Sequence, residues 1–362
     1  MTSNTVCITL NQVQIGMVSA EAIYSSTGLK LIDKGASITQ THLFRLKLYQ
    51  IFNLHVYTND KFSLKSTESN SNTEINALES DSNFKLFKKK YIQTISEINV
   101  LMYSLIEGND VKEQLCECCA ALLSYLPNKN DLFMYLYNIE SKTYKEATLV
   151  HSLNVGMICS ILGNWLKFSD LQIKELMLSG LLHDIGKFNI SNEIINKPGR
   201  LTSEEFEIIK THPISGYHNI QNADIAYGAK MAILQHHEKQ DGSGYPYGFK
   251  AAQIHDYAKI VAIVDIYDAM TSERTYRKRL SPFCVLRLLE EEGHSILDTK
   301  YLSVFLENLA LLHTGKTALL SNGESGKIIF INRNLPSRPL VQAGNNMYNL
   351  EFETSLDIVD IL

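Results

Sequence analysis

Histidine and aspartate residues that could bind metal ions recur through the middle of this 362-residue chain. Five of the eleven histidines and two aspartates belong to this set: His151, His183-Asp184, His212, His236-His237 and Asp265. Imidazole and carboxylate groups are the ligands that hold borderline divalent ions such as iron, manganese and zinc. One ordinary ion needs fewer ligands than this set offers. The residue types therefore predict two divalent metal ions that share a carboxylate.

The vicinal pair His183-Asp184 follows an apolar segment with helical spacing, residues 178–182. Adjacent ligands allow the imidazole to bind one ion while the carboxylate bridges to the next, at the separation of about 3.5–4 Å that two-metal sites use. Lys187 lies three residues after Asp184, so a helix would place both side chains on one face. The alternative for Lys187 is an exposed lysine at a helix end.

A second vicinal pair, His236-His237, precedes the string Asp-Gly-Ser-Gly-Tyr-Pro at 241–246. Glycines allow backbone angles that other residues avoid, and proline restricts a turn, so the string predicts a rigid loop. Such a loop could hold Tyr245 over a bound ligand. An ordinary surface turn is the alternative.

Asp265 lies in the apolar segment 262–270, which has the composition of a buried helix. A carboxylate in such a helix is destabilising unless it is paired or bound to a metal ion. Asp268 follows one turn later, where we expect it to support the site or to cap a helix.

The elements that must position these residues are helical. Residues 131–315 show apolar faces with helical spacing and short breaks, which predicts an all-helical domain. We expect a mainly α fold, with a small α+β module at 1–60 and a short β-rich appendage at 316–362. Residues 61–84 are rich in Ser, Asn, Thr and Glu, which predicts a flexible linker. Residues 85–130 predict connecting helices, with homodimer formation as an alternative role.

Alternation of apolar and polar residues predicts the smaller elements. In the first module we expect strands at 6–10 and 54–57, a hairpin built from 16–18 and 28–32, and a helix at 39–49. In the C-terminal appendage we expect short strands at 317–320, 326–331 and 340–341.

Composition limits the partners of this chain. The net charge of −5 argues against DNA or RNA polymers and anionic membranes as partners, because both require basic surfaces. We see no apolar run approaching the roughly 18 residues of a membrane span and no secretory signal. The six cysteines lack the spacing of a disulfide framework or of a zinc knuckle. We therefore expect a cytoplasmic protein with reduced thiols.

Four ordered motifs lie between His151 and Lys278. They are His183-Asp184-Ile185-Gly186-Lys187, Thr211-His212-Pro213, residues 236–246 (HHEKQDGSGYP), and Asp265 followed by Arg274-Thr275-Tyr276-Arg277-Lys278. In this order they resemble the HD-GYP family of bacterial cyclic dinucleotide phosphodiesterases. The resemblance implies an enzyme that hydrolyses cyclic di-GMP to linear pGpG and, if a second bond is cut, to GMP.

The resemblance also implies roles for individual residues. His151, His183, Asp184 and Asp265 would hold one ion, and Asp184 with His212, His236 and His237 would hold the second. Iron is the common metal of the family, and manganese is another candidate. Asp184 and Lys187 would be catalytic. Contacts with the dinucleotide would come from Lys187, Gly244, Tyr245, Arg274 and Arg277.

Two positions depart from the family pattern. Ala147 stands where some members have a glutamate that helps to build a third metal site, and Glu146 is one residue out of phase. We therefore expect two ions rather than three. Thr275 replaces a frequent proline, which loosens the basic segment by the entropy that a proline would remove.

Three alternative functions stay open. A cyclic dinucleotide receptor with weak catalysis is consistent with Ala147. A phosphodiesterase for 3′,3′-cyclic GMP-AMP is the second alternative, since no residue separates the two substrates. The third is an HD-type phosphohydrolase for mononucleotides, against which the Gly-Tyr-Pro loop and the basic segment 274–278 weigh.

Overall fold

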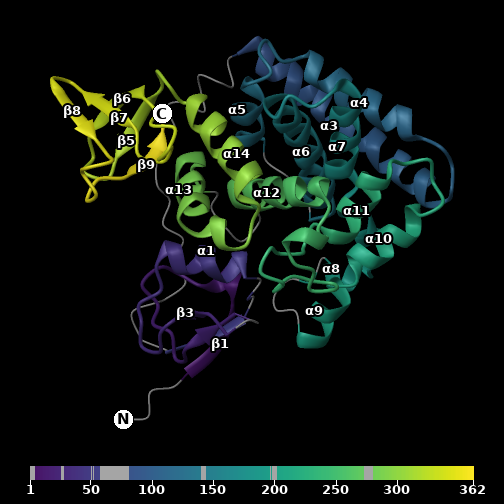
Figure 1. Ribbon diagram of the computed structural model, residues 1–362, viewed down its shortest axis with the longest axis horizontal. Helices are drawn as coiled ribbons and strands as arrows, with labels where there is room; N and C mark the ends of the chain where they lie inside the picture. Colours follow the sequence, from purple (N-terminus) through teal and green to yellow (C-terminus); the bar gives the residue numbers. More distant parts are fainter. Residues whose placement is uncertain are drawn as a thin grey trace.

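The computed structural model describes residues 5–25, 28–49, 51, 53–57, 81–139, 144–195, 197, 202–272 and 280–362. Helices fill the right side of Figure 1, with a small N-terminal module below and a C-terminal sheet at the upper left. The predicted fold class, mainly α with an α+β module and a β-rich tail, is confirmed. Residues 61–80 of the predicted linker lie outside the described residues.

The N-terminal module combines two short antiparallel strand pairs with one helix. Strand β1 (Thr5–Thr9) pairs with β4 (Asn53–Tyr57), and β2 (Ile23–Tyr24) pairs with β3 (Lys30–Ile32); η1 (Leu10–Gln12) follows β1. Helix α1 (Gln40–Leu48) begins where the Thr39 side chain accepts a hydrogen bond from the His42 backbone N–H. The strands predicted at 6–10 and 54–57 and the helix predicted at 39–49 are confirmed.

The predicted hairpin is wrong in its first strand. We expected residues 16–18 to pair with 28–32, but β2 is the partner of β3, and Val18 instead forms an isolated bridge with Ser37. The Ser25 N–H donates to the Leu29 carbonyl at 2.8 Å, so the chain reverses between these residues. A tight reversal pairs the residues that flank it.

Residues 82–311 form the helical part of the chain. Its α-helices are α3 (Ser82–Ile106), α4 (Lys112–Ser124), α5 (Asp131–Tyr137), α6 (Tyr144–Trp165), α7 (Asp170–Leu182), α8 (Asn192–Ile195), α9 (Ser203–Ile209), α10 (His212–Ile220), α11 (Tyr227–Gln235), α12 (Asp256–Thr271), α13 (Pro282–Glu292) and α14 (Thr299–Leu311). The 3-10 turns η2 (Ile185–Asn189), η3 (Ala251–Gln253) and η4 (Gly293–Ser295) connect them. Several helices begin at side-chain caps, such as Ser169 before α7 and Thr202 before α9.

Helices α6 and α7 lie at the centre of the core and approach each other closely. A Cβ atom at Gly180 of α7 would lie 2.8 Å from the Val155 carbonyl oxygen of α6, so only glycine permits this contact. Helices α11 and α12 pack against this pair, and α10 packs against α11 and against the turn η2 that follows α7. Five elements that are distant in the sequence thus meet at one place.

Helix α6 corrects one expectation drawn from the sequence. Its segment Ala147–Trp165 spans 19 residues with a mean hydropathy of 1.2, which is long and apolar enough to cross a membrane by length and composition. In the folded chain 83% of that window is buried. An all-round apolar helix is what the centre of a large helical core requires.

A five-stranded antiparallel sheet closes the chain. Its strands are β5 (Thr317–Leu320), β6 (Ser325–Phe330), β7 (Leu340–Ala343), β8 (Asn346–Asn349) and β9 (Ile358–Ile361), in the order β8-β7-β6-β5-β9. An ion pair between Arg287 of α13 and Asp357 joins the sheet to the helical domain, and Arg338, which lies between β6 and β7, also pairs with Asp357. The predicted strands are present, whereas β8 and β9 were not predicted.

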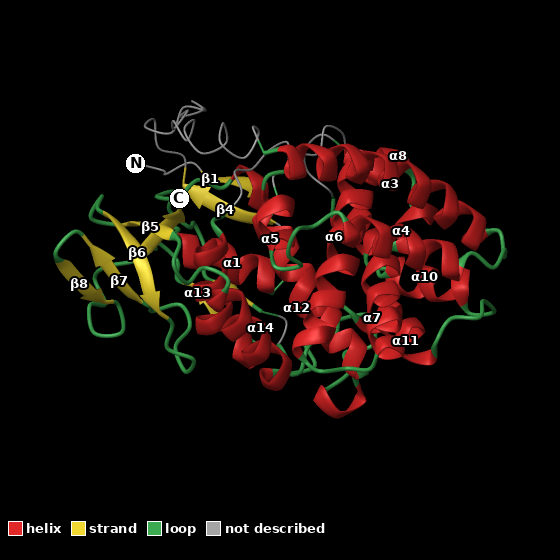
Figure 2. Cartoon of the chain, turned by 90° about the horizontal axis from the view of Figure 1, so that it is seen from above, coloured by secondary structure: helices red, strands yellow, loops and turns green. Residues whose placement is uncertain are grey.

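The N-terminal module contacts the helical domain through α1. Arg45 of α1 forms an ion pair with Glu292 at the end of α13, with 2.8 Å between nitrogen and oxygen. The ammonium of Lys239 lies over the ring of Tyr49, 5.1 Å from its centroid. Figures 1 and 2 both show α1 beside α13. The module therefore lies against the loop that follows His236-His237.

All six cysteines are free thiols, as the sequence predicted. Cys116 and Cys119 are buried on one face of α4. Burial raises the pKa of the Cys116 thiol to about 11. A thiol with a raised pKa is a poor nucleophile and metal ligand, so both side chains belong to the core.

His313 is a buried histidine without a visible role. It is 6% exposed, packs against Phe283 at 5.4 Å between ring centroids, and neither ring nitrogen has a hydrogen-bond partner among the described residues. Burial lowers its pKa to about 3. Since the unfolded histidine titrates near 6.5, stability that is present above pH 6.5 is lost as the pH falls towards 3.

We expect His313→Leu to raise the free energy of unfolding by about 1–2 kcal/mol at pH 5 and by less at pH 8, because leucine leaves no buried nitrogen to protonate. Urea denaturation at the two pH values measures this difference. His294→Leu is the matched control, since His294 is exposed. An unchanged pH dependence in His313→Leu would contradict the prediction.

Candidate metal centre

The seven predicted ligands converge although they come from different helices. His151 lies on α6, His183 ends α7, His212 begins α10, His236 ends α11, and Asp265 lies on α12. Their potential ligand atoms form two groups, each with all atoms within 4.8 Å of one another. One group contains Asp184, His212, His236 and His237, and the other contains His151, His183 and Asp265.

Asp184 lies between the two groups and presents one oxygen to each. Its Oδ1 is 3.2 Å from His212 Nε2 and 3.9 Å from His236 Nε2. Its Oδ2 is 3.4 Å from His183 Nε2. A carboxylate in this position can bridge two cations.

Helix ends orient three of the imidazoles. The Nδ1 atoms of His183, His212 and His236 lie 2.7, 2.8 and 2.9 Å from the carbonyl oxygens of Gly180, Ile209 and Ile233. These carbonyls belong to the last turns of α7, α9 and α11, where a helix leaves carbonyl groups without an internal partner. A carbonyl only accepts, so each Nδ1 donates and each Nε2 keeps its lone pair.

The lone pairs point towards one another at the centre of the site. His212 Nε2 and His236 Nε2 are 3.2 Å apart, and neither has a hydrogen to donate. His183 Nε2 and Asp184 Oδ1 are buried without a hydrogen-bond partner among the residues that the structure describes. Converging acceptors repel unless a cation lies between them. The buried cluster is therefore compatible with a metal site.

The protonation states of His236, His237 and Asp184 are also compatible with metal binding. Burial, reinforced by the neighbouring histidines, lowers the pKa of His236 and of His237 well below the usual range. Burial opposes ionisation of Asp184, but Lys187 and His183 outweigh it and hold the pKa well below its usual range. Neutral imidazoles and an ionised carboxylate are the forms that bind metal ions.

His151 is held between two carboxylates of α12. Its Nε2 lies 2.9 Å from Asp265 Oδ1, and its Nδ1 lies 2.7 Å from Asp268 Oδ2. Burial opposes protonation, but the two carboxylates raise the pKa of His151 to about 9. Asp268 thus supports His151, one of the two roles expected from the sequence.

The loop after His237 is fixed by Glu238. Its carboxylate accepts hydrogen bonds from the backbone N–H groups of Tyr247 and Phe249 at 2.8 and 2.9 Å. A Cβ atom at Gly244 would lie 2.5 Å from the Glu238 Cα and from the His237 carbonyl oxygen. The loop therefore lies directly on the backbone of His237 and Glu238, which requires glycine at 244.

Tyr245 lies beside two histidines of the candidate site. Its ring centroid is 4.7 Å from that of His237 and 6.4 Å from that of His212. Burial raises the pKa of its hydroxyl well above the usual range, so the group stays protonated. The role of Glu238 was not predicted from the sequence. The feature that could have indicated it is an acidic residue placed directly between His236-His237 and a glycine-rich turn.

Lys187 lies at the edge of the site. Its ammonium is 2.6 Å from Asp184 Oδ2, and its side chain is 26% exposed. Ala147 lies on α6, one turn before His151. Arg274 and Arg277 lie outside the described residues.

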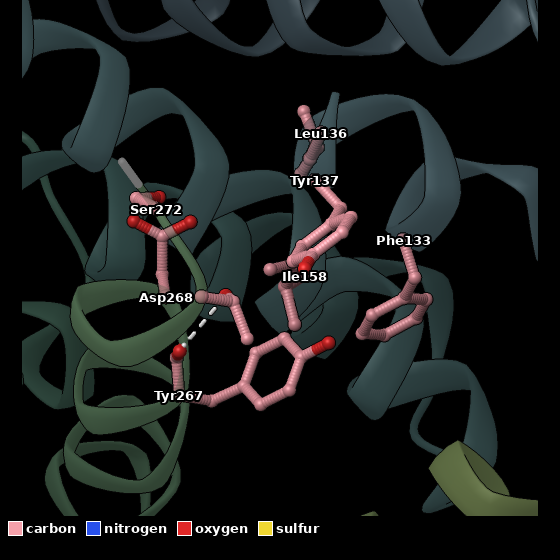
Figure 3. Close-up of a pocket in the computed structure, with 8 residues that line it drawn as sticks. Phe133, Leu136, Tyr137, Ile158, Tyr267, Asp268 and Ser272 are labelled. Atoms are coloured by element: carbon pink, nitrogen blue, oxygen red, sulfur yellow. Dashed lines mark hydrogen bonds between the residues drawn. The ribbon is translucent and has the colours of Figure 1, made fainter. Parts of the chain in front are cut away.

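A small cavity borders Asp268 on the side of α5. Figure 3 shows Phe133 and Tyr137 of α5 across from Tyr267 and Asp268 of α12. Its volume is about 10 Å³, the space of about one water molecule. This cavity is too small for a nucleotide.

The comparisons with known proteins agree with this geometry. Residues 136–300 match the family model described as HD domain. This segment resembles an HD domain. It contains all seven converging residues, and the match confirms the recognition made from the motifs.

Relatives of the HD domain are found among curated proteins. A cyclic di-GMP phosphodiesterase of Pseudomonas aeruginosa is 34% identical over 193 residues, which are 53% of this chain and 46% of the relative. A 3′3′-cGAMP-specific phosphodiesterase of Vibrio cholerae is 34% identical over 165 residues, 44% of this chain and 38% of the relative. The chain thus spans less than half the length of either relative.

One solved structure is similar over a larger share of the chain. An HDG"Y"P protein from Bdellovibrio bacteriovorus covers 84% of this chain and 99% of its own, with a TM-score of 0.49 and 18% identity.

Proposed function

We propose that this chain is a metal-dependent phosphodiesterase that hydrolyses cyclic di-GMP to linear pGpG and, if a second bond is cut, to GMP. The observation that carries the proposal is the set of imidazole lone pairs directed at the two oxygens of Asp184. The names of the relatives support a cyclic dinucleotide as the substrate.

We propose that two divalent ions bind, with iron as the first candidate and manganese as the second. His151, His183 and Asp265 would hold one, while His212, His236 and His237 would hold the other, with Asp184 shared between them. Bound divalent ions lower the pKa of water to about 7, which supplies a hydroxide nucleophile at neutral pH, and neutralise phosphate charge.

The residues around the ligands would bind and orient the substrate. The exposed part of Lys187 would let its ammonium stabilise negative charge on a phosphoryl oxygen. Tyr245, protonated beside His237, would donate a hydrogen bond or offer its ring to a base. Gly244 permits the close approach of this loop, and Arg274 and Arg277 remain proposed dinucleotide contacts.

We propose a cytoplasmic setting, with no DNA or RNA polymer and no membrane as a partner. We also propose the domain limits 1–60, 61–81, 82–130, 131–315 and 316–362, in which the start of α3 at Ser82 moves the predicted end of the linker from 84 to 81 and the fourth segment encloses the HD match. Homodimer formation through residues 85–130 remains an alternative role for that segment.

The test is hydrolysis of cyclic di-GMP by protein purified without oxygen, with metal content measured on the same sample. We expect turnover with about two ions per chain. Bound metal and bound nucleotide without turnover would favour a receptor. Turnover of 3′,3′-cyclic GMP-AMP alone would favour the second substrate, for which the Vibrio relative is named.

A further inference from the structure

Helix α3 precedes the HD domain in the chain, yet it takes part in a buried hydrogen-bonded chain that ends at His151. We propose that Tyr91 of α3 and Asn154 of α6 are positioning residues for the metal ligand His151. Helix α3 is then part of the metal centre. This inference rests on the proposed metal site.

The hydrogen-bonded chain from Tyr91 to His151 consists of three contacts. His151 Nδ1 lies 2.7 Å from Asp268 Oδ2. The Asn154 amide nitrogen donates to Asp268 Oδ1 at 2.8 Å. The Tyr91 hydroxyl donates to Asn154 Oδ1 at 2.5 Å. All four side chains are buried, so water does not compete for these groups.

Each member of the chain can act in only one way. A carboxylate only accepts, so Asn154 must turn its amide nitrogen towards Asp268 and its carbonyl oxygen towards Tyr91. The Tyr91 hydroxyl also lies 3.3 Å from the Val150 carbonyl oxygen, a second acceptor. The single hydroxyl hydrogen is directed to the nearer acceptor, Asn154 Oδ1, and phenylalanine cannot supply it.

Helical spacing places the members of this hydrogen-bonded chain next to the His151 imidazole. His151 and Asn154 are three residues apart on α6, and Asp265 and Asp268 are three residues apart on α12, so each pair shares a face. Asp265 thus faces Nε2 of His151 while Asp268 faces Nδ1. The outer partner of a ligating histidine fixes its tautomer and ring orientation and raises its basicity.

An aromatic cluster holds Tyr91 in place. Its ring centroid is 5.9 Å from that of Phe87, which in turn lies 5.2 Å from that of Tyr135 on α5. The Tyr91 side chain is fully buried in this cluster. Packing between α3, α5 and α6 therefore determines where the hydroxyl lies, and any shift of α3 would break its bond with Asn154.

The experiment measures Mn²⁺ binding by the full chain after removal of metal. We expect Tyr91→Phe to lower the binding affinity for one of the two ions by up to about 10-fold. Asn154→Leu should lower it by about 10- to 100-fold, the range for outer partners of metal ligands. Titration calorimetry gives the number of ions and both dissociation constants.

Tyr135→Phe is the matched control. Tyr135 belongs to the same aromatic cluster, and its hydroxyl contacts Asp81 Oδ2 at 3.3 Å rather than the chain to His151. We expect both Mn²⁺ constants to stay unchanged in this variant. Thermal unfolding of the metal-free proteins reports whether Tyr91→Phe and Tyr135→Phe differ in stability.

The double variant tests whether the two residues act in series. If Tyr91 acts through Asn154, adding Tyr91→Phe to Asn154→Leu weakens Mn²⁺ binding no further. If the losses of Mn²⁺ affinity in the two single variants add up in the double variant, the proposed hydrogen-bonded chain is overturned. It is also overturned if Tyr91→Phe lowers the affinity for both ions equally.

The outcomes separate this inference from the proposed function. Two Mn²⁺ ions in the unaltered protein, with the same constants in Tyr91→Phe, would overturn only the role of Tyr91. Absence of Mn²⁺ binding in the unaltered protein would instead reject the metal site itself.

Discussion

Asp184→Ala should release both metal ions and abolish hydrolysis of cyclic di-GMP. Among the residues that the structure describes, this carboxylate presents one oxygen to each ligand group, so its loss should open both sites at once. Removal of a shared ligand takes away the nucleophile and the charge stabilisation together, and we expect kcat/KM to fall by about 10³-fold or more.

Metal content and turnover of the same Asp184→Ala sample measure this effect. Asp170→Ala is the matched control, because Asp170 is exposed at the start of α7, the helix that leads into the His183-Asp184 pair. The control should keep its metal and its activity. Full activity in Asp184→Ala, or retention of both ions, would rule out the shared-carboxylate site.

Lys187→Met should lower turnover by about 10²- to 10³-fold while both ions stay bound. Methionine keeps much of the length of the side chain but removes the ammonium that lies 2.6 Å from Asp184 Oδ2. One donor aimed at charge that develops in the transition state contributes about this much to kcat. The ligands themselves are unchanged, so metal content should be preserved.

Steady-state kinetics together with metal analysis decides the role of Lys187. Lys174→Met is the matched control, since Lys174 lies on α7, the helix that precedes the turn with Lys187, and is well exposed. An effect confined to KM would mean that Lys187 binds substrate without stabilising the transition state. Loss of metal in Lys187→Met would contradict the proposed role, since the lysine would then be needed to hold Asp184 in place.

The ligand set could be predicted because its signals are local. His183-Asp184 and His236-His237 are adjacent in the sequence, and Asp265 stands out as a carboxylate within an apolar helix. Helical spacing likewise depends on neighbouring residues, which explains why the helical domain and α1 were predicted correctly. The fold class followed from the same periodicity.

The errors also have local causes. Strands β8 and β9 are short and have little apolar alternation, so pairing with β7 and β5 determines them rather than their own residues. Helix α6 has a composition that serves either a membrane span or a buried core. Only the packing of α7 and α12 around it distinguishes these two cases.

By itself, the sequence determined which residue types are available for a metal site and that helices carry them. Only the tertiary structure decided that each oxygen of Asp184 faces a different group, that Nε2 atoms from separate helix ends meet, and that Tyr91 is connected to His151. These features depend on contacts between helices that are far apart in the chain. Such contacts arise from side-chain packing, which no spacing within one segment encodes.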